Sequence, residues 1–89
     1  MNKKQKLFQA AKNNPQNVKF SDLEKLATFV GFFLDRTKGS HKMYKRSDNP
    51  SQVIPFQPDK HNTKMAKGYQ VNQLVNFIED NNLQFMLEV

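Results

Sequence analysis

Apolar residues recur at helical spacing in two stretches of the chain. In the first stretch they are Leu23, Leu26, Ala27 and Val30, and in the second they are Val71, Leu74, Val75 and Ile78. Steps of three and four residues place such side chains on one face of a helix. The pattern therefore predicts two amphipathic helices, and a shorter pattern of the same kind predicts a third helix over residues 2–13.

Polar residues mark where these helices begin and end. Ser21 and Glu24 have the spacing of a capping box, in which two side chains satisfy free amides at a helix start. Gly31 is placed to end the same helix in a left-handed conformation. Pro15 ends the N-terminal helix, because the residue before a proline avoids helical geometry. The last helix is predicted to end at Asn81 and its neighbour.

Between the two amphipathic helices the chain has the character of β-strands. Residues 32–37, 40–46 and 52–56 are predicted strands, and the first two are joined by a hairpin turn at Lys38-Gly39. Pro55 cannot donate to a neighbouring strand, so the third strand should lie at an edge or end there.

Alternation in the second strand puts His41 and Met43 on one side and Lys42 and Tyr44 on the other. The first strand does not tell which side is buried, because it begins with three consecutive apolar residues. Helices and strands in this order predict an α+β fold with the helices on one face of a small sheet. Residues 57–67 are predicted to be an exposed loop, and the apolar tail 83–89 is either docked or a short strand.

Length and composition restrict the classes of protein that remain. A chain of 89 residues is one domain with a thin core. It contains no cysteine, which excludes disulfides, thiolate catalysis and Cys-based zinc sites. No apolar run follows the basic N-terminus or approaches the length of a membrane span. We expect a soluble, cytoplasmic protein that does not associate with membranes.

Positive charge is concentrated in the middle of the chain. The net charge is +6, and residues 36–67 carry eight basic and two acidic side chains, whereas residues 68–89 carry three acidic and no basic ones. Localised positive charge attracts polyanions, nucleic acid first. For the charge alone, a solvated surface is the simpler explanation.

The most unusual local string runs from Lys38 to His41, where a turn enters the second strand. A histidine can accept or release a proton near neutral pH, and the hydroxyl of Ser40 and the turn amides could bind a phosphate oxygen. The same residue types are common in hairpins, so spacing alone favours an ordinary turn. His61, the only other histidine, lies in a polar loop. His61, His41 and Asp59 together would be a poor set of zinc ligands, so we expect no metal.

Aromatic and basic residues interleave around this turn, an arrangement that can stack bases and hold phosphates. They are Arg36, Lys42, Tyr44, Lys45, Arg46, Phe56, Lys67 and Tyr69. Taken singly, each aromatic residue is explained slightly better as a half-buried residue of the sheet or the start of a helix.

Several motifs together carry a family resemblance. In chain order they are the capped helix, Gly31-Phe32, Arg36, Gly39-Ser40-His41, Val53-Ile54-Pro55 and Gly68-Tyr69-Gln70-Val71. In this order and spacing the chain closely resembles the HicA toxins, the small ribonucleases of bacterial HicAB toxin–antitoxin pairs. The longer members carry an additional N-terminal helix, so the resemblance covers nearly the whole chain.

The resemblance implies a fold like a double-stranded-RNA-binding domain, with helix, three antiparallel strands and helix in that order. It implies metal-independent cleavage of messenger RNA with His41 as the catalytic residue, no cofactor, and a HicB-type antitoxin that blocks the site. Family members often have a histidine where this chain has Gln57. We expect RNA contacts from Arg36, Lys38, Gly39, Ser40, Lys42, Lys45, Lys67 and Tyr69.

Cleaving RNA with its own 2′-hydroxyl needs a base, an acid and positive charge for the transition state. One imidazole cannot begin a turnover in both protonation states, so a second group or water must share the work. His61 is the candidate by residue type, but we favour His41 alone among the histidines. The alternative is a non-catalytic RNA-binding module of the same fold, and a more distant one is an adaptor for an acidic protein.

Overall fold

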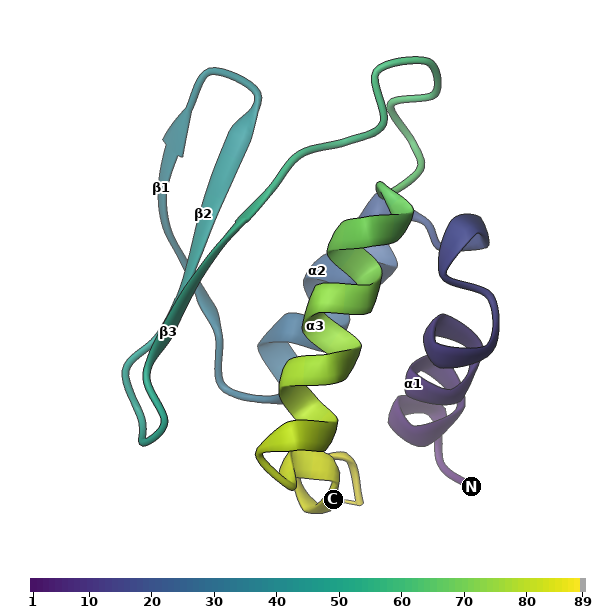
Figure 1. The fold of residues 1–89 in the computed structure, drawn as a ribbon, viewed down its shortest axis with the longest axis vertical. Helices are drawn as coiled ribbons and strands as arrows, with labels where there is room; N and C mark the ends of the chain where they lie inside the picture. The colour runs from purple at the N-terminus through teal and green to yellow at the C-terminus, as the bar shows by residue number, and fades with distance from the viewer. Residues whose placement is uncertain (89) are drawn as a thin grey trace.

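The chain folds into three α-helices packed on one three-stranded sheet (Figure 1). The computed structural model describes residues 1–88; Val89, the last residue of the predicted tail, lies outside them. The helices are α1 (Lys3–Asn13), α2 (Phe20–Phe29) and α3 (Gly68–Asp80). The strands are β1 (Phe33–Lys38), β2 (His41–Arg46) and β3 (Gln52–Phe56). Short 3₁₀ helices span Pro15–Asn17 (η1) and Leu83–Leu87 (η2).

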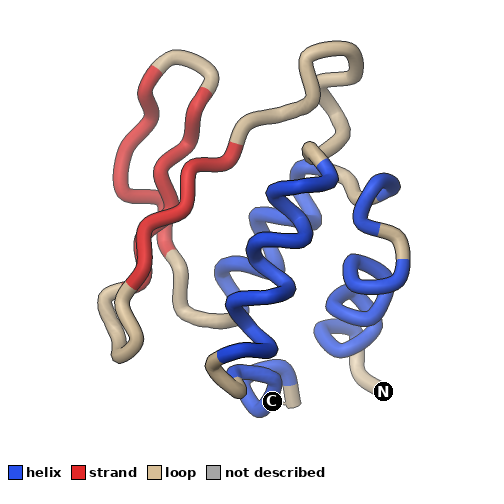
Figure 2. Tube along the Cα trace, in the orientation of Figure 1, coloured by secondary structure: helices blue, strands red, loops and turns tan. Residues whose placement is uncertain are grey.

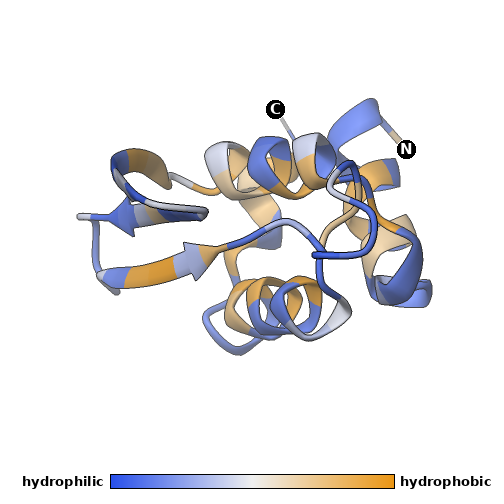
Figure 3. Ribbon diagram, turned by 90° about the horizontal axis from the view of Figure 1, so that it is seen from above, coloured by the Kyte–Doolittle hydropathy of each residue, from blue (hydrophilic) through white to orange (hydrophobic). Residues whose placement is uncertain are grey.

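The strands form an antiparallel sheet in the order β1-β2-β3, and all helices lie on one side of it (Figure 2). This confirms the predicted α+β class and the arrangement of helix, three strands and helix, with α1 as the additional helix. Pro55 lies in β3, at the edge of the sheet, as its missing amide requires. Figure 3, the view from above, shows the sheet and the helices as separate layers.

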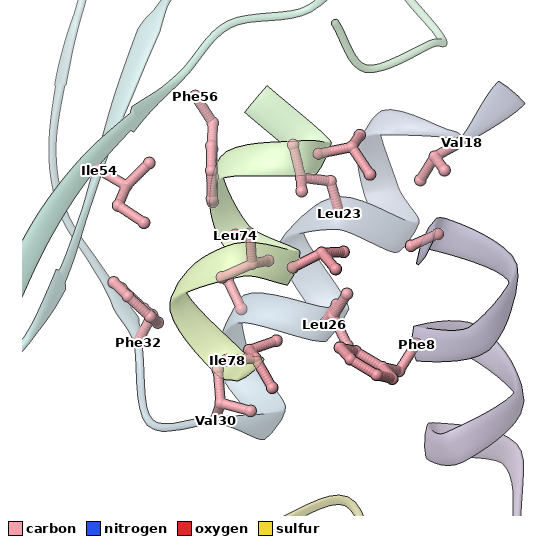
Figure 4. Close-up of a cluster of buried hydrophobic side chains, with 14 of the residues drawn as sticks. Phe8, Val18, Leu23, Leu26, Val30, Phe32, Ile54, Phe56, Leu74 and Ile78 are labelled. Atoms are coloured by element: carbon pink, nitrogen blue, oxygen red, sulfur yellow. The ribbon is translucent and has the colours of Figure 1, made fainter. Parts of the chain in front are cut away.

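The core lies between the sheet and α2 and α3, and α1 covers the far side of these helices (Figure 4). All eight apolar residues of the two predicted helical stripes are buried. The sheet contributes Ile54 and Phe56, which are fully buried, and Phe32 packs edge to face on Phe77 with ring centroids 5.5 Å apart. Helical periodicity therefore identified the helix side of the core, and only its sheet side needed the structure.

The capping box predicted at Ser21 and Glu24 is wrong. Helix α2 begins at Phe20 with Lys19 as its N-cap, and no side chain caps it. Its start is held by the backbone instead, because Phe20 N–H donates to Lys64 O at 2.9 Å. The bridge between Lys19 and Met65 keeps the preceding chain extended, so the helix starts two residues earlier than a cap at Ser21 requires, and Glu24 is free to reach the sheet.

The strand ends at the hairpin differ from the prediction by one residue: β1 continues to Lys38, and β2 begins at His41. The hairpin turn therefore lies at Gly39 and Ser40, because Lys38 still pairs with His41 as part of the ladder. Gly39 takes the left-handed φ of 57° that the turn needs, and Gly31 with φ 97° ends α2 as expected. The predicted tail is docked as η2, with Leu83 and Leu87 buried, and it forms no strand over residues 83–88.

A capping box does occur at α1, where the sequence analysis did not place one. Asn2 Oδ1 accepts from Gln5 N–H at 2.8 Å, and Gln5 Oε1 accepts from Asn2 N–H at 2.9 Å. The amide of Asn2 also donates to Leu87 O at 2.8 Å, so the two ends of the described chain are tied together. Within residues 1–88, no helix has both the length and the apolar character that crossing a membrane requires.

Arg46 is the one charged residue of the described chain that is buried, with 3% of its surface exposed. Its guanidinium donates to Val30 O at 2.7 Å, to Pro50 O at 2.8 Å and to Asp48 O at 3.3 Å. It also approaches Met86 Sδ at 3.7 Å. One side chain of β2 therefore ties together the end of α2, the β2–β3 loop and the tail.

Replacing this guanidinium should weaken the whole fold. The substitution Arg46→Met keeps the length of the side chain but leaves buried carbonyls without donors, so we expect the free energy of unfolding to fall by about 2–4 kcal/mol. Urea denaturation measures this. Lys45→Met, one residue earlier and exposed, is the matched control and should stay within about 0.5 kcal/mol of wild type. Equal effects of the two substitutions would contradict the role given to Arg46.

Candidate functional site

His41 lies at the tip of the β1–β2 hairpin, directly after the turn formed by Gly39 and Ser40. Its side chain is exposed, and its cross-strand partner is Lys38, which is also exposed. The ladder holds the backbone of His41 while solvent reaches its imidazole. This is the geometry that proton transfer to a large external substrate requires.

The contacts of β2 decide which face of the sheet His41 occupies. Tyr44 Oη donates to Glu24 Oε2 of α2 at 2.5 Å, and Lys42 Nζ donates to the same oxygen at 3.2 Å. These two side chains therefore point towards the helices. Because successive residues of a strand alternate, His41 and its odd-numbered neighbours point to the side that no helix covers.

We call this side the open face of the sheet. Residues paired across antiparallel strands share a face, so the partners of His41, Met43 and Lys45 in β1 and β3 belong to it. The open face consists of Phe33, Arg36, Lys38, His41, Met43, Lys45, Val53 and Pro55. Of the residues expected to contact RNA, the structure brings Arg36, Lys38 and Lys45 together with His41 on this face.

Lys42 lies on the other, helix-covered side of the sheet. Its ammonium group forms an ion pair with Glu24 and lies 5.6 Å from the ring centroid of Phe20. Burial of Tyr44, and secondly its bond to the Glu24 carboxylate, raise the pKa of the phenol, so this group stays protonated. Glu24, which the sequence analysis had assigned to a helix cap, thus joins α2 to the sheet.

Directly beside the hairpin tip, three side chains form a hydrogen-bonded chain. Gln57 Nε2 donates to Ser40 Oγ at 2.9 Å, and Lys67 Nζ donates to Gln57 Oε1 at 2.9 Å. Gln57 follows the end of β3 and Lys67 is the N-cap of α3. Through Gln57, these hydrogen bonds connect the ammonium group of Lys67 to Ser40, the residue that precedes His41.

Gln70 anchors this chain and was not identified from the sequence. Its side chain is buried, with Oε1 accepting from Gln57 N–H at 2.9 Å and Nε2 donating to Pro55 O at 3.1 Å. A signal was present, because Gln70 lies one turn before Leu74, on the flank of the apolar stripe. A polar residue at such a position needs a buried partner.

The remaining predicted residues gather in a hollow at the start of α3. Its lining includes His61, Lys67 and Tyr69, with Asp59 beside them. The backbone N–H groups of His61 and then Asn62 donate to Asp59 Oδ1, which lowers the pKa of that carboxyl. Lys67 belongs both to this hollow and to the chain that reaches Ser40, so His61 lines a hollow next to that chain.

In the part of the chain that the structure describes, no three histidine, aspartate or glutamate side chains come together as a potential metal-binding group. The hairpin tip, the end of β3 and the start of α3 thus provide hydrogen-bond donors and cations around His41. This arrangement suits an anionic substrate.

Comparison with protein families identifies the chain. The family model described as the HicA toxin of bacterial toxin–antitoxin systems matches residues 20–75. These residues run from the start of α2 into α3 and contain the hairpin, Gln57 and Lys67. The chain belongs to the HicA toxin family. No curated protein matches the chain, and no solved structure does.

As a member of this family, the protein is the toxin of a toxin–antitoxin pair and therefore has a cognate antitoxin. Helix α1 and the tail lie outside the matched residues, and both pack on the matched part. In this HicA toxin the matched segment contains every residue that we expected to contribute to the site.

The support given by Gln70 can be tested separately from activity. Gln70→Leu removes the acceptor of Gln57 N–H and the donor to Pro55 O, so the free energy of unfolding should fall by about 1–3 kcal/mol. Gln73→Leu, on the exposed side of α3, should change it by no more than about 0.5 kcal/mol. Chemical denaturation of both variants measures the difference. A Gln70→Leu protein as stable as wild type would show that this anchor is dispensable.

Proposed function

We propose that this HicA toxin is an endoribonuclease that cleaves messenger RNA in the cytoplasm without a metal ion, with His41 as general acid or base. The observation that carries the proposal is the position of His41. It is the one histidine that lies on the sheet ladder at the hairpin tip, exposed beside Lys38 and next to the Ser40–Gln57–Lys67 chain.

In the proposed reaction the 2′-oxygen of a nucleotide attacks the neighbouring phosphorus, and a base takes its proton. The P–O5′ bond breaks, and an acid gives a proton to the 5′-oxygen that leaves. The products are a 2′,3′-cyclic phosphate and a 5′-hydroxyl, so no external reactant is consumed. His41 can perform either transfer, because imidazole accepts and donates protons near neutral pH.

Positive charge must stabilise the pentacovalent phosphorus that forms in this step. Lys67 is suited to this role, because its hydrogen bond to Gln57 holds it beside the hairpin tip. Lys38, the cross-strand partner of His41, is the second cation at this end of the sheet. Gln57 cannot titrate, so the partner of His41 in proton transfer is water, a cation or His61, which lines a hollow together with Lys67.

The cognate antitoxin is proposed to be of the HicB type and to inhibit by covering the hairpin tip. An exposed histidine on an exposed turn is accessible to a protein partner as readily as to RNA. The alternative is a non-catalytic RNA-binding module, for which the basic open face would suffice. That alternative gives no reason for a histidine at the tip, and it predicts salt-sensitive binding with intact RNA.

The decisive test compares wild type with His41→Ala in an RNA cleavage assay that contains a metal chelator. Loss of a general acid or base costs about a hundred- to ten-thousand-fold in rate. His41 is exposed, so the thermal unfolding temperature should not change, which separates catalysis from folding. Wild-type cleavage by the variant would refute the catalytic assignment, and cleavage abolished by the chelator would refute metal independence. His61→Ala, in parallel, determines whether the loop histidine is the second group.

The role of Lys67 can be tested against a lysine of the same loop. Removal of one group that stabilises transition-state charge typically lowers the rate by about a hundredfold. We therefore expect Lys67→Met to lower the rate of the chemical step strongly in single-turnover cleavage at saturating protein. Lys64→Met removes the same charge from an exposed position and should affect mainly binding at low protein concentration. Equal rates at saturation for the two variants would contradict the proposal.

A further inference from the structure

We propose that the open face is a binding surface for single-stranded RNA, on which a base stacks against Phe33 while phosphates are held by Arg36, Lys38 and Lys45. The inference deepens the proposed function and rests on it for the identity of the polyanion. It adds the strandedness of the substrate and the path that it takes from His41 across the sheet.

The paired residues of the open face carry positive charge. They include three cations and His41 and no acidic residue; the exposed Asp35 lies at the irregularity of β1 between Leu34 and Arg36 and is not among the paired positions. Glu24 of α2 is on the opposite side of the sheet and is bound to Lys42 and Tyr44. A polyanion on the open face therefore meets positive charge without a carboxylate from the paired positions opposing it.

The same face exposes large apolar side chains. Phe33 is 47% exposed and Val53 is 48% exposed. Phe33 of β1 and Val53 of β3 are the two cross-strand partners of Lys45. An exposed aromatic ring beside a cation is the arrangement with which proteins stack an unpaired base and neutralise its phosphate. The ring faces of bases in a duplex are already covered by their neighbours, so this surface favours a single strand.

The rows of the open face lie in a line that starts at His41. The first row is Lys38 and His41, and the second is Arg36, Met43 and Pro55. The third row consists of Lys45, which lies four residues after His41 along β2, or about 13 Å, and its partners Phe33 and Val53. An RNA single strand that places its scissile phosphate at His41 and continues along β2 therefore passes close to Phe33.

His41 also decides between RNA and an acidic protein as the occupant. The substrate of the proposed reaction must bring a phosphate to His41, so nucleotides next to that phosphate necessarily approach the open face. An acidic protein partner could use the same cations, but it would have no comparable use for an exposed phenyl ring among them. The observations therefore favour RNA.

The chain contains no tryptophan, so one introduced tryptophan reports on a single position. Phe33→Trp places it on the open face, and Leu34→Trp places it on the next residue, which is 46% exposed and paired with Tyr44 on the other side. We would titrate both variants with a short, non-cleavable 2′-O-methyl single-stranded oligonucleotide and record tryptophan fluorescence. The same oligonucleotide as a duplex and poly-glutamate serve as further probes.

The proposal expects the single strand to quench the tryptophan of Phe33→Trp and to leave that of Leu34→Trp nearly unchanged. Phe33→Ala should weaken binding of the single strand by about fivefold or more, because fivefold is the smallest loss of affinity typical for removing one stacking ring. Leu34→Ala should keep wild-type affinity. Because both positions are half exposed, neither substitution should unfold the protein, and thermal unfolding checks this.

Three outcomes would overturn the proposal. They are equal quenching at the two positions, binding that leaves the Phe33→Trp signal unchanged, and an equal or larger response to the duplex or to poly-glutamate. Failure of the proposed function is distinguished by cleavage of ordinary RNA, which is measured separately. Cleavage without quenching would reject this binding path alone, and quenching without cleavage would reject the enzyme and retain the RNA surface.

Discussion

Alternation along the central strand β2 is the constraint on which both the core and the site depend. Tyr44 and Arg46 point towards the helices, where they bind Glu24 and Val30. The odd-numbered residues of β2, His41, Met43 and Lys45, point outwards. Because the period of a strand is two, a slip by one residue would exchange the two sets. The same slip would bury His41 and expose the groups that join the sheet to α2. The stability of the fold and the proposed activity therefore depend on the same pairing register of β2.

Buried polar side chains then set the distances between elements. Arg46 connects β2 to α2, the β2–β3 loop and the tail, and Gln70 connects α3 to the end of β3. Each satisfies backbone groups that apolar packing would leave unpaired. The consequence for the site is that Ser40, Gln57 and Lys67 come from three elements whose relative positions are fixed independently of any bound RNA.

The sequence and the structure disagree where a local motif competes with tertiary contacts. Ser21 and Glu24 have capping-box spacing, yet the backbone bridge to residues 64–66 starts α2 earlier and Glu24 binds the sheet. Alternation predicts that Lys42 lies on the opposite side of β2 from His41, but it does not predict the ion pair of Lys42 with Glu24. In both cases the partner is more than fifteen residues away in the chain, so no local pattern contains it.

Periodicity, turn residues and proline placement were enough to determine three helices, three strands and their order, because each of these depends on neighbouring residues alone. The string from Lys38 to His41 likewise identified the hairpin tip and its histidine. Only the tertiary structure decided which face of the sheet His41 occupies, since the apolar start of β1 is compatible with either side. It also decided that Gln57 links Ser40 to Lys67 and that Gln70 binds the backbone at the end of β3. These features depend on contacts between segments that are remote in sequence, and the packing of the helices on the sheet determines those contacts.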